Sequence, residues 1–161
     1  MDASRRPLPK ADMMRARLAL VAVLASLALA ACGRPAATPT VRFETGGAPL
    51  TSAAAEALAA STDISAFASV TSTDAPALRA EVLEQLRAKG DAGVRAAELL
   101  TKGFPARTAS VPVLVRLCAV DGIDAVVVVE TFGDAGTTLT HRRLWIFDRT
   151  TGALLRAASF S

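Results

Sequence analysis

Several residue types that carry enzyme chemistry are scarce in this chain of 161 residues. It has one histidine, His141, and two cysteines, Cys32 and Cys118. A protein zinc site takes three or four ligands, mostly histidine and cysteine, so this scarcity argues against a metal centre. The sequence also lacks a Gly-x-Ser-x-Gly nucleophile elbow, a Cys-x-x-Cys pair and a glycine-rich phosphate loop. We therefore predict a protein that is not an enzyme and that has no catalytic residues, metal or dissociable cofactor.

Other absences concern the source of the chain rather than its fold. Tyrosine and asparagine are missing, isoleucine occurs three times, and three lysines stand against 15 arginines. The depleted residues are those with AT-rich codons, which indicates a bacterium with a GC-rich genome. The arginine excess therefore does not by itself indicate phosphate recognition.

The N-terminal region has the order of parts found in an export signal. Five basic residues are followed by the uncharged stretch 18–31, LALVAVLASLALAA. A helix needs about 20 apolar residues to span a bilayer, and this stretch of 14 is shorter. Its length suits the apolar segment of a signal peptide. A buried helix of a soluble domain is the alternative, and the basic flank and small-residue ending favour export.

The apolar stretch ends in Leu29-Ala30-Ala31-Cys32-Gly33. This sequence resembles the lipobox of bacterial lipoproteins. The resemblance implies that Cys32 carries a covalent diacylglyceryl group and an N-acyl chain, and that a signal peptidase recognises the flanking residues and cleaves before Cys32. Each buried methylene contributes about 0.8 kcal/mol, so two or three acyl chains would anchor the protein to a membrane.

The resemblance implies a location but leaves the export route open. Gly33 follows the cysteine where an aspartate would retain a Gram-negative lipoprotein at the inner membrane. We therefore expect the periplasmic face of the outer membrane in a Gram-negative source, or the outer face of the cell membrane in a Gram-positive one. Residues 4–10, SRRPLPK, resemble a degraded twin-arginine motif, although Sec export is favoured. Met1, Met13 and Met14 are all candidate starts.

The positive charge of the chain belongs to this signal region. The chain has a net charge of +3, and its first 31 residues hold five of the 18 Lys/Arg and two of the 15 Asp/Glu. The remaining 130 residues therefore hold 13 of each and are neutral. An exported, neutral domain does not suit nucleic acid. The expected partners are the membrane, reached through the lipid, and an envelope protein or a small ligand.

The second cysteine is expected to be structural. If Cys32 is lipidated, Cys118 has no partner for an intramolecular disulfide; otherwise a bridge between the two is the alternative. Cys118 lies among apolar residues, which predicts a buried, inert thiol. The competing hypothesis is a redox or partner-linking thiol, for which the neighbouring Arg116 is the supporting feature.

We divide the chain into a signal peptide at 1–31, a tether at 32–72 and a folded domain at 73–161. The tether is rich in Ala, Pro, Thr, Ser and Gly and has few residues to bury, so we expect it to be flexible. An Ala-rich segment at 51–60 can form a short helix within it, and Ile64, Phe67 and Val70 can pack onto the folded domain as an arm.

The folded domain changes its hydrophobic period once. Leu78, Val82 and Leu86 recur at helical spacing after Asp74, and a second helix follows between Asp91 and Gly103. From residue 111 the period becomes two, which predicts strands at 111–120, 123–132, 139–148 and 153–160. The predicted fold is α+β: two short helices, then a four-stranded antiparallel meander, with the helices packed on one sheet face.

The Asp121-Gly122 pair between the first two strands is a strong hairpin signal. A two-residue turn there places Val115 opposite Val128 and Val113 opposite Glu130.

One stretch of the third strand is a candidate binding surface. It contains Arg142, Arg143, Trp145 and Phe147, with Arg143, Trp145 and Phe147 expected on one side. Contact with a lipid headgroup or a glycan is one interpretation, and protection of an edge strand by arginine is the other.

We interpret the protein as a lipid-anchored envelope lipoprotein with a non-enzymatic binding or interaction domain. A small-ligand carrier with a pocket between helices and sheet is the alternative. A hydrolytic enzyme is the third hypothesis, and would need His141 to meet Asp148 and either Ser110 or Ser159.

Overall fold

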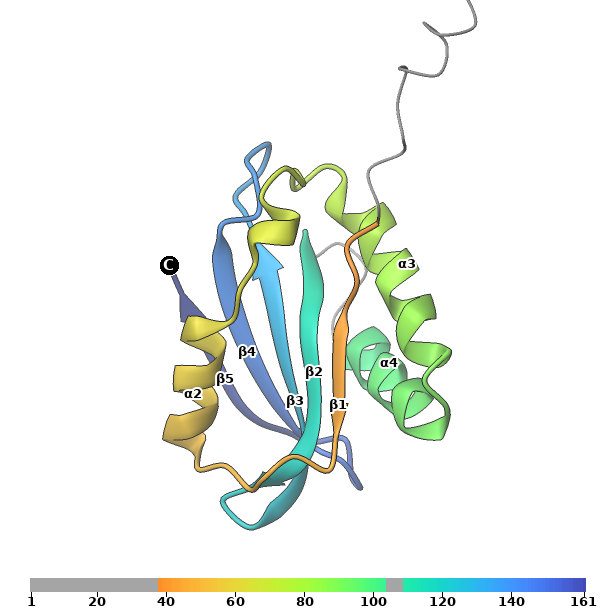
Figure 1. The fold of residues 1–161 in the computed structure, drawn as a ribbon, viewed down its shortest axis with the longest axis vertical. Helices are drawn as coiled ribbons and strands as arrows, with labels where there is room; N and C mark the ends of the chain where they lie inside the picture. The colour runs from red at the N-terminus through yellow and green to blue at the C-terminus, as the bar shows by residue number, and fades with distance from the viewer. Residues whose placement is uncertain (1–37, 104–108) are drawn as a thin grey trace, which may run out of the picture. The chain divides into compact units, whose positions relative to one another are not determined.

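The computed structural model describes residues 38–103 and 109–161 (Figure 1). The predicted signal peptide and the lipobox residues Leu29, Ala30, Ala31, Cys32 and Gly33 lie outside them. The described elements are, in chain order, β1 (Arg42–Thr45), α2 (Ser52–Ser61), a 3-10 turn η1 (Ser65–Phe67), α3 (Ala75–Arg87), α4 (Asp91–Gly103), β2 (Ser110–Val120), β3 (Ile123–Phe132), β4 (His141–Asp148) and β5 (Leu154–Phe160). The predicted α+β class is confirmed.

The strands form one five-stranded sheet in the order β1-β2-β3-β4-β5. β2 to β5 make the antiparallel meander that the sequence predicts. The sheet is nevertheless mixed, because β1 adds a fifth strand parallel to β2, with Arg42 opposite Leu114. The prediction of a four-stranded, wholly antiparallel sheet was therefore incomplete.

The prediction of a flexible tether as far as residue 72 was wrong for its second part. Val41 and Phe67 are buried in the core, and α2 buries Ala55 and Ala59. The predicted helix at 51–60 is α2. These apolar residues are too sparse to order a segment by themselves, but the sheet supplies a surface on which they pack.

The helices lie on both faces of the sheet rather than on one. Neighbouring residues of a strand point to opposite faces, so the register pair Glu130 and Arg143 points away from Arg142. Glu130 contacts Arg79 of α3, whereas Arg142 contacts Thr62 at the end of α2. α3 and α4 pack against each other on the first face, as predicted, and α2 covers the second (Figure 1).

The β2–β3 hairpin turns at Asp121 and Gly122, which have φ angles of 49° and 83°. These left-handed values fit the two-residue hairpin turn that Asp-Gly favours. The predicted pairing of Val115 with Val128 is confirmed, but a bulge at Val113 places Pro112, not Val113, opposite Glu130. The pairing of β1 with β2 begins at Leu114, so no strand lies beside Pro112 on the β1 side of β2. Pro112 has no N–H to donate, and at this position none is needed.

The space between the helices and the sheet is filled with apolar side chains. Fully buried residues come from α3, α4 and the strands: Val82, Leu86, Ala97, Leu100, Val115, Val126 and Val128. In the described residues no helix is long and apolar enough to cross a membrane.

Candidate functional site

A buried ion pair joins helix α3 to the middle of the sheet. Arg79 Nη1 contacts Glu130 Oε1, and both side chains are almost fully buried. Ser110 Oγ donates to Glu130 Oε2 at 2.9 Å, and Trp145 Nε1 donates to the same oxygen at 3.0 Å. Arg79 also donates to the carbonyl oxygens of Ser110 and Leu100, at 3.1 and 3.3 Å. Both charges are therefore compensated by specific partners, as burial of an ion pair requires.

This ion pair was not predicted from the sequence, although each member left a signal there. Arg79 precedes Val82 and Leu86 by three and seven residues, which places it on the buried stripe of α3. Glu130 follows four consecutive valines on a central strand. A charge at a position where the pattern predicts an apolar residue indicates a buried partner. The bulge at Val113 then brings Ser110 and Glu130 within hydrogen-bonding distance.

An arginine stacked on aromatic rings lies on the same sheet face. The Arg143 guanidinium carbon is 4.2 Å from the centre of the Phe132 ring and 5.4 Å from that of Trp145. The Phe132 and His141 rings are 5.3 Å apart. We call Phe132, His141, Arg143 and Trp145 the arginine–aromatic cluster. Trp145 is hydrogen-bonded to Glu130, so the buried ion pair fixes the position of the Trp145 side chain in this cluster.

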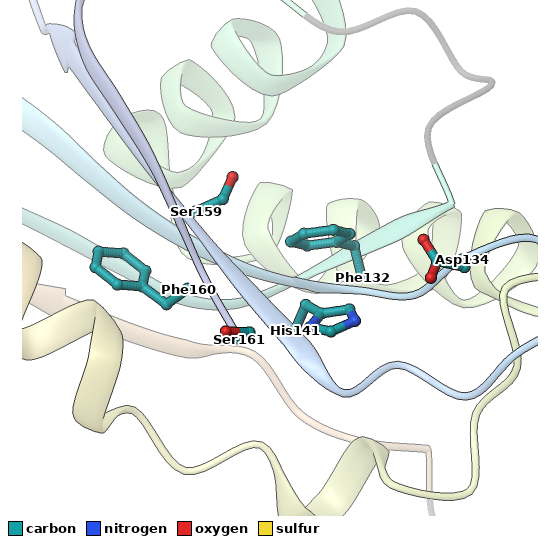
Figure 2. A pocket seen from close by; sticks show the side chains of 6 residues that line it. All are labelled: Phe132, Asp134, His141, Ser159, Phe160 and Ser161. Atoms are coloured by element: carbon teal, nitrogen blue, oxygen red, sulfur yellow. The ribbon is translucent and has the colours of Figure 1, made fainter.

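A shallow hollow of about 310 Å³ opens beside the cluster (Figure 2). It is lined by Phe132, Asp134, His141, Ser159, Phe160 and Ser161. In the view of Figure 2 the Phe132 ring stands between Asp134 and Ser159, and His141 lies next to that ring. The hollow thus offers aromatic surface, an imidazole, hydroxyls and a carboxylate at one end of the sheet.

The structure separates the residues of the hydrolytic hypothesis. Asp148 is seven residues from His141 on β4, which corresponds to roughly 23 Å at the usual rise of a strand. Its carboxylate accepts from the backbone N–H groups of Thr150 and Thr151, and these bonds lower its pKa. Ser110 is bound to Glu130. Ser159 shares the hollow with His141, but within the described residues no hydrogen bond joins the two, so the Ser–His–Asp arrangement is not assembled.

The predicted binding surface divides between the two sheet faces. Arg143 and Trp145 lie together in the cluster, as the alternation predicts. Arg142 lies on the opposite face, where its Nε donates to the Thr62 carbonyl at 2.8 Å. Phe147 shares a face with Trp145 but is only 3% exposed and belongs to the core. Phe132 was not predicted, because it reaches His141 and Arg143 only through the register of β3 with β4.

Cys118 is buried and forms no disulfide. Burial raises the pKa of its thiol, and the guanidinium of Arg116 opposes this shift only in part. The prediction of a buried thiol is confirmed. A raised pKa keeps the sulfur in its less reactive, protonated form.

Comparisons with known proteins add no assignment. No protein family model matches the chain, and searches of curated proteins and of solved structures found no match. Across residues 38–103 and 109–161 there is no group of three or more His, Cys, Asp or Glu that could hold a metal ion.

Proposed function

We propose that this protein is an exported, lipid-anchored component of a bacterial cell envelope, and that its folded domain is a non-enzymatic binding module. The anchor rests on the sequence Leu29-Ala30-Ala31-Cys32, which resembles a lipobox. The binding role rests on the arginine–aromatic cluster and the hollow beside it. The partner is an envelope component that presents a carboxylate or phosphate group to Arg143.

The stacking of Arg143 is the observation that carries the binding role. Its guanidinium lies over Phe132, is half-buried, and makes no hydrogen bond or ion pair to any described residue. The planar guanidinium can therefore offer its N–H groups to a ligand in the paired geometry that suits carboxylate and phosphate. An arginine held by aromatic rings also loses less side-chain freedom on binding.

The hollow adds apolar contact to this charged group. Phe132 and His141 belong to both the cluster and the hollow, so a ligand over Arg143 can also contact them and Ser159, which lies opposite Arg143 on β5. Such a combination of aromatic anchors and an arginine is typical of the residues that dominate binding energy at interfaces.

The alternative of a carrier with a pocket between helices and sheet receives no support. The side chains that face each other there, such as Leu86 and Val115, are completely buried. The hollow described above lies at the ends of β3, β4 and β5 instead.

Photocrosslinking in growing cells tests the binding role. A photoreactive residue at Ser159, an exposed position in the hollow, should capture an envelope component, and the same residue at Ala77 on α3 should not. Arg143→Ala should abolish the capture, and Arg143→Lys should weaken it because lysine lacks the planar, bidentate group. Arg142→Ala, on the opposite face, is the matched control. Capture that is unchanged in Arg143→Ala would contradict the proposal.

A further inference from the structure

The arginine–aromatic cluster and its hollow lie at the end of the sheet where the described chain begins. β1 runs parallel to β2, so the chain enters the sheet from the end at which β2 starts. The antiparallel pairing places Phe132, the last residue of β3, opposite Ser110 and His141, the first residues of β2 and β4. Phe160, the last residue of β5, lies at the same end, opposite Arg142. Figure 1 shows the start of the described chain, in orange, and the arrowhead of β3 at this end.

The chain between the proposed lipid anchor and the folded domain is short. Thr38, the first described residue, is six residues after Cys32. A chain extends by at most about 3.6 Å per residue, so the path between them cannot exceed about 22 Å. β2 has 11 residues, which places the far end of the sheet about 36 Å further away. If Cys32 carries a lipid, the end of the sheet with the hollow is therefore held within reach of the lipid headgroups.

Two opposite charges flank the aromatic surface at this end. The Arg143 guanidinium lies over the Phe132 ring, and Asp134 lies beside that ring on the side away from Ser159 (Figure 2). The Asp134 side chain is exposed, and its carboxylate makes no hydrogen bond or ion pair to a described residue. The connection 133–140 between β3 and β4 contains no other charged residue. The site therefore suits a ligand that carries an anionic and a cationic group close together.

We propose that this ligand is the headgroup of an ethanolamine phospholipid in the membrane that holds the anchor. The proposal rests on the proposed function, from which it takes the lipid at Cys32 and the role of Arg143. The phosphate of the headgroup accepts the paired N–H groups of Arg143. Its ammonium group, two carbons away, lies in the hollow against the Phe132 and Phe160 rings and pairs with Asp134. A purely anionic headgroup would bring no cation to compensate the Asp134 carboxylate.

The anchor explains how so open a site can be occupied. The hollow is shallow, and an exposed ion pair or cation–π contact contributes little affinity by itself. A site held to its ligand by a short linker meets that ligand at an effective concentration of about millimolar or above. The headgroups around the anchor satisfy this condition, which favours a membrane lipid over a soluble zwitterion.

Photocrosslinking of the lipidated full chain in vesicles tests the choice of headgroup. The vesicles contain equal amounts of phosphatidylethanolamine and phosphatidylglycerol, and mass spectrometry identifies the lipid attached to a photoreactive residue at Ser159. The ethanolamine lipid should be captured in about fivefold excess. Asp134→Asn should make the two yields equal, whereas Glu81→Gln, at an exposed position of α3, should keep the preference. Equal yields in the parent chain, or a preference that persists in Asp134→Asn, would overturn the proposal.

The same photoreactive residue in growing cells separates this proposal from the proposed function. Capture of an ethanolamine phospholipid that is lost in Arg143→Ala would support both. Arg143-dependent capture of a protein or a glycan would overturn the lipid assignment and leave the binding role in place. Capture that does not depend on Arg143 would overturn both.

Tryptophan fluorescence provides a test that needs no substitution. Trp145 is the only tryptophan of the chain and belongs to the arginine–aromatic cluster. In vesicles, a phospholipid with a nitroxide on its headgroup should quench the emission of the lipidated chain more than one with a nitroxide at the end of an acyl chain. Emission that is insensitive to the headgroup nitroxide would show that the site does not reach the membrane surface, and would overturn the proposal.

Discussion

Glu130 is at the centre of the buried network of polar side chains. It accepts hydrogen bonds from Arg79, Ser110 and Trp145. Replacing one member of a buried ion pair leaves the other charge uncompensated, which typically costs about 3–5 kcal/mol. We expect Glu130→Gln to lower the free energy of unfolding by about 3 kcal/mol, measured by urea denaturation. Glu81→Gln, at an exposed position of α3, should change it by less than about 0.5 kcal/mol.

A second substitution separates the cost of the unpaired Arg79 charge from the cost of lost hydrogen bonds. Glutamine keeps an acceptor for Ser110 and Trp145, so most of the loss should come from the isolated Arg79 charge. Adding Arg79→Met to Glu130→Gln should therefore recover part of the stability. A double variant that is less stable than Glu130→Gln would show that Arg79 contributes mainly through its bonds to the Ser110 and Leu100 carbonyls.

The carboxyl group of Asp121 makes the stability of the folded protein depend on pH. Its carboxylate accepts from the hydroxyl and the backbone N–H of Ser52, and these bonds lower its pKa. A carboxyl group whose pKa is lower in the folded state stabilises the protein above its unfolded pKa, and this contribution is lost as the pH falls through the folded pKa. Asp121→Asn should therefore lower the melting temperature at neutral pH, with a difference that disappears in acid.

Asparagine is a suitable replacement because it tolerates the left-handed φ of 49° at this position. Ser52→Ala should give the same pH-dependent loss, whereas Ser69→Ala, at an exposed position, should give none. A loss in Asp121→Asn that is constant with pH would mean that the turn, and not the charge, is responsible.

At the level of elements, α3 and α4 approach closely at one glycine. A Cβ atom on Gly93 would lie 2.0 Å from the backbone carbonyl oxygen of Leu86 and 2.8 Å from Lys89 Cβ. Backbone cannot move aside as a flexible side chain can. Gly93→Ala should therefore destabilise the protein by about 1–3 kcal/mol, despite the better helix propensity of alanine. Val94→Ala, at an exposed neighbouring position, is the control; similar melting temperatures for both variants would contradict the close packing.

The elements that could be predicted are those with local signals. The meander follows from a period of two and from Asp121-Gly122, and α3 and α4 follow from helical spacing and from the glycines that end them. β1 could not be predicted in this way, because its four residues are ordered by pairing with β2, far along the chain. The bulge at Val113 was not predicted either, because the Asp121-Gly122 turn by itself implies an unbroken register.

The candidate site was predictable only in part, for the same reason. Arg143 and Trp145 alternate on one strand and were expected to lie together. Phe132 and His141 join them through the register of β3 and β4, and the partner of Glu130 comes from a helix. The hollow lies where the ends of β3, β4 and β5 meet, so no pattern within a single segment of the sequence predicts it.

At the scale of the whole molecule, the proposed function assigns membrane attachment to Cys32 and binding to the folded domain. The neutral charge of residues 32–161 and the buried, unpaired Cys118 both fit a domain that is exported and attached through Cys32. The arginine–aromatic cluster and the hollow beside it then supply the contact surface for a ligand.

Metabolic labelling with a clickable fatty acid tests whether a lipid is attached at Cys32. The full chain expressed in a bacterium should incorporate the label and partition with membranes. Cys32→Ala should lose the label, whereas Cys118→Ala, which removes the other thiol, should keep it. A label that persists in Cys32→Ala, or one that the parent chain never acquires, would show that the protein is not anchored through a lipid on Cys32.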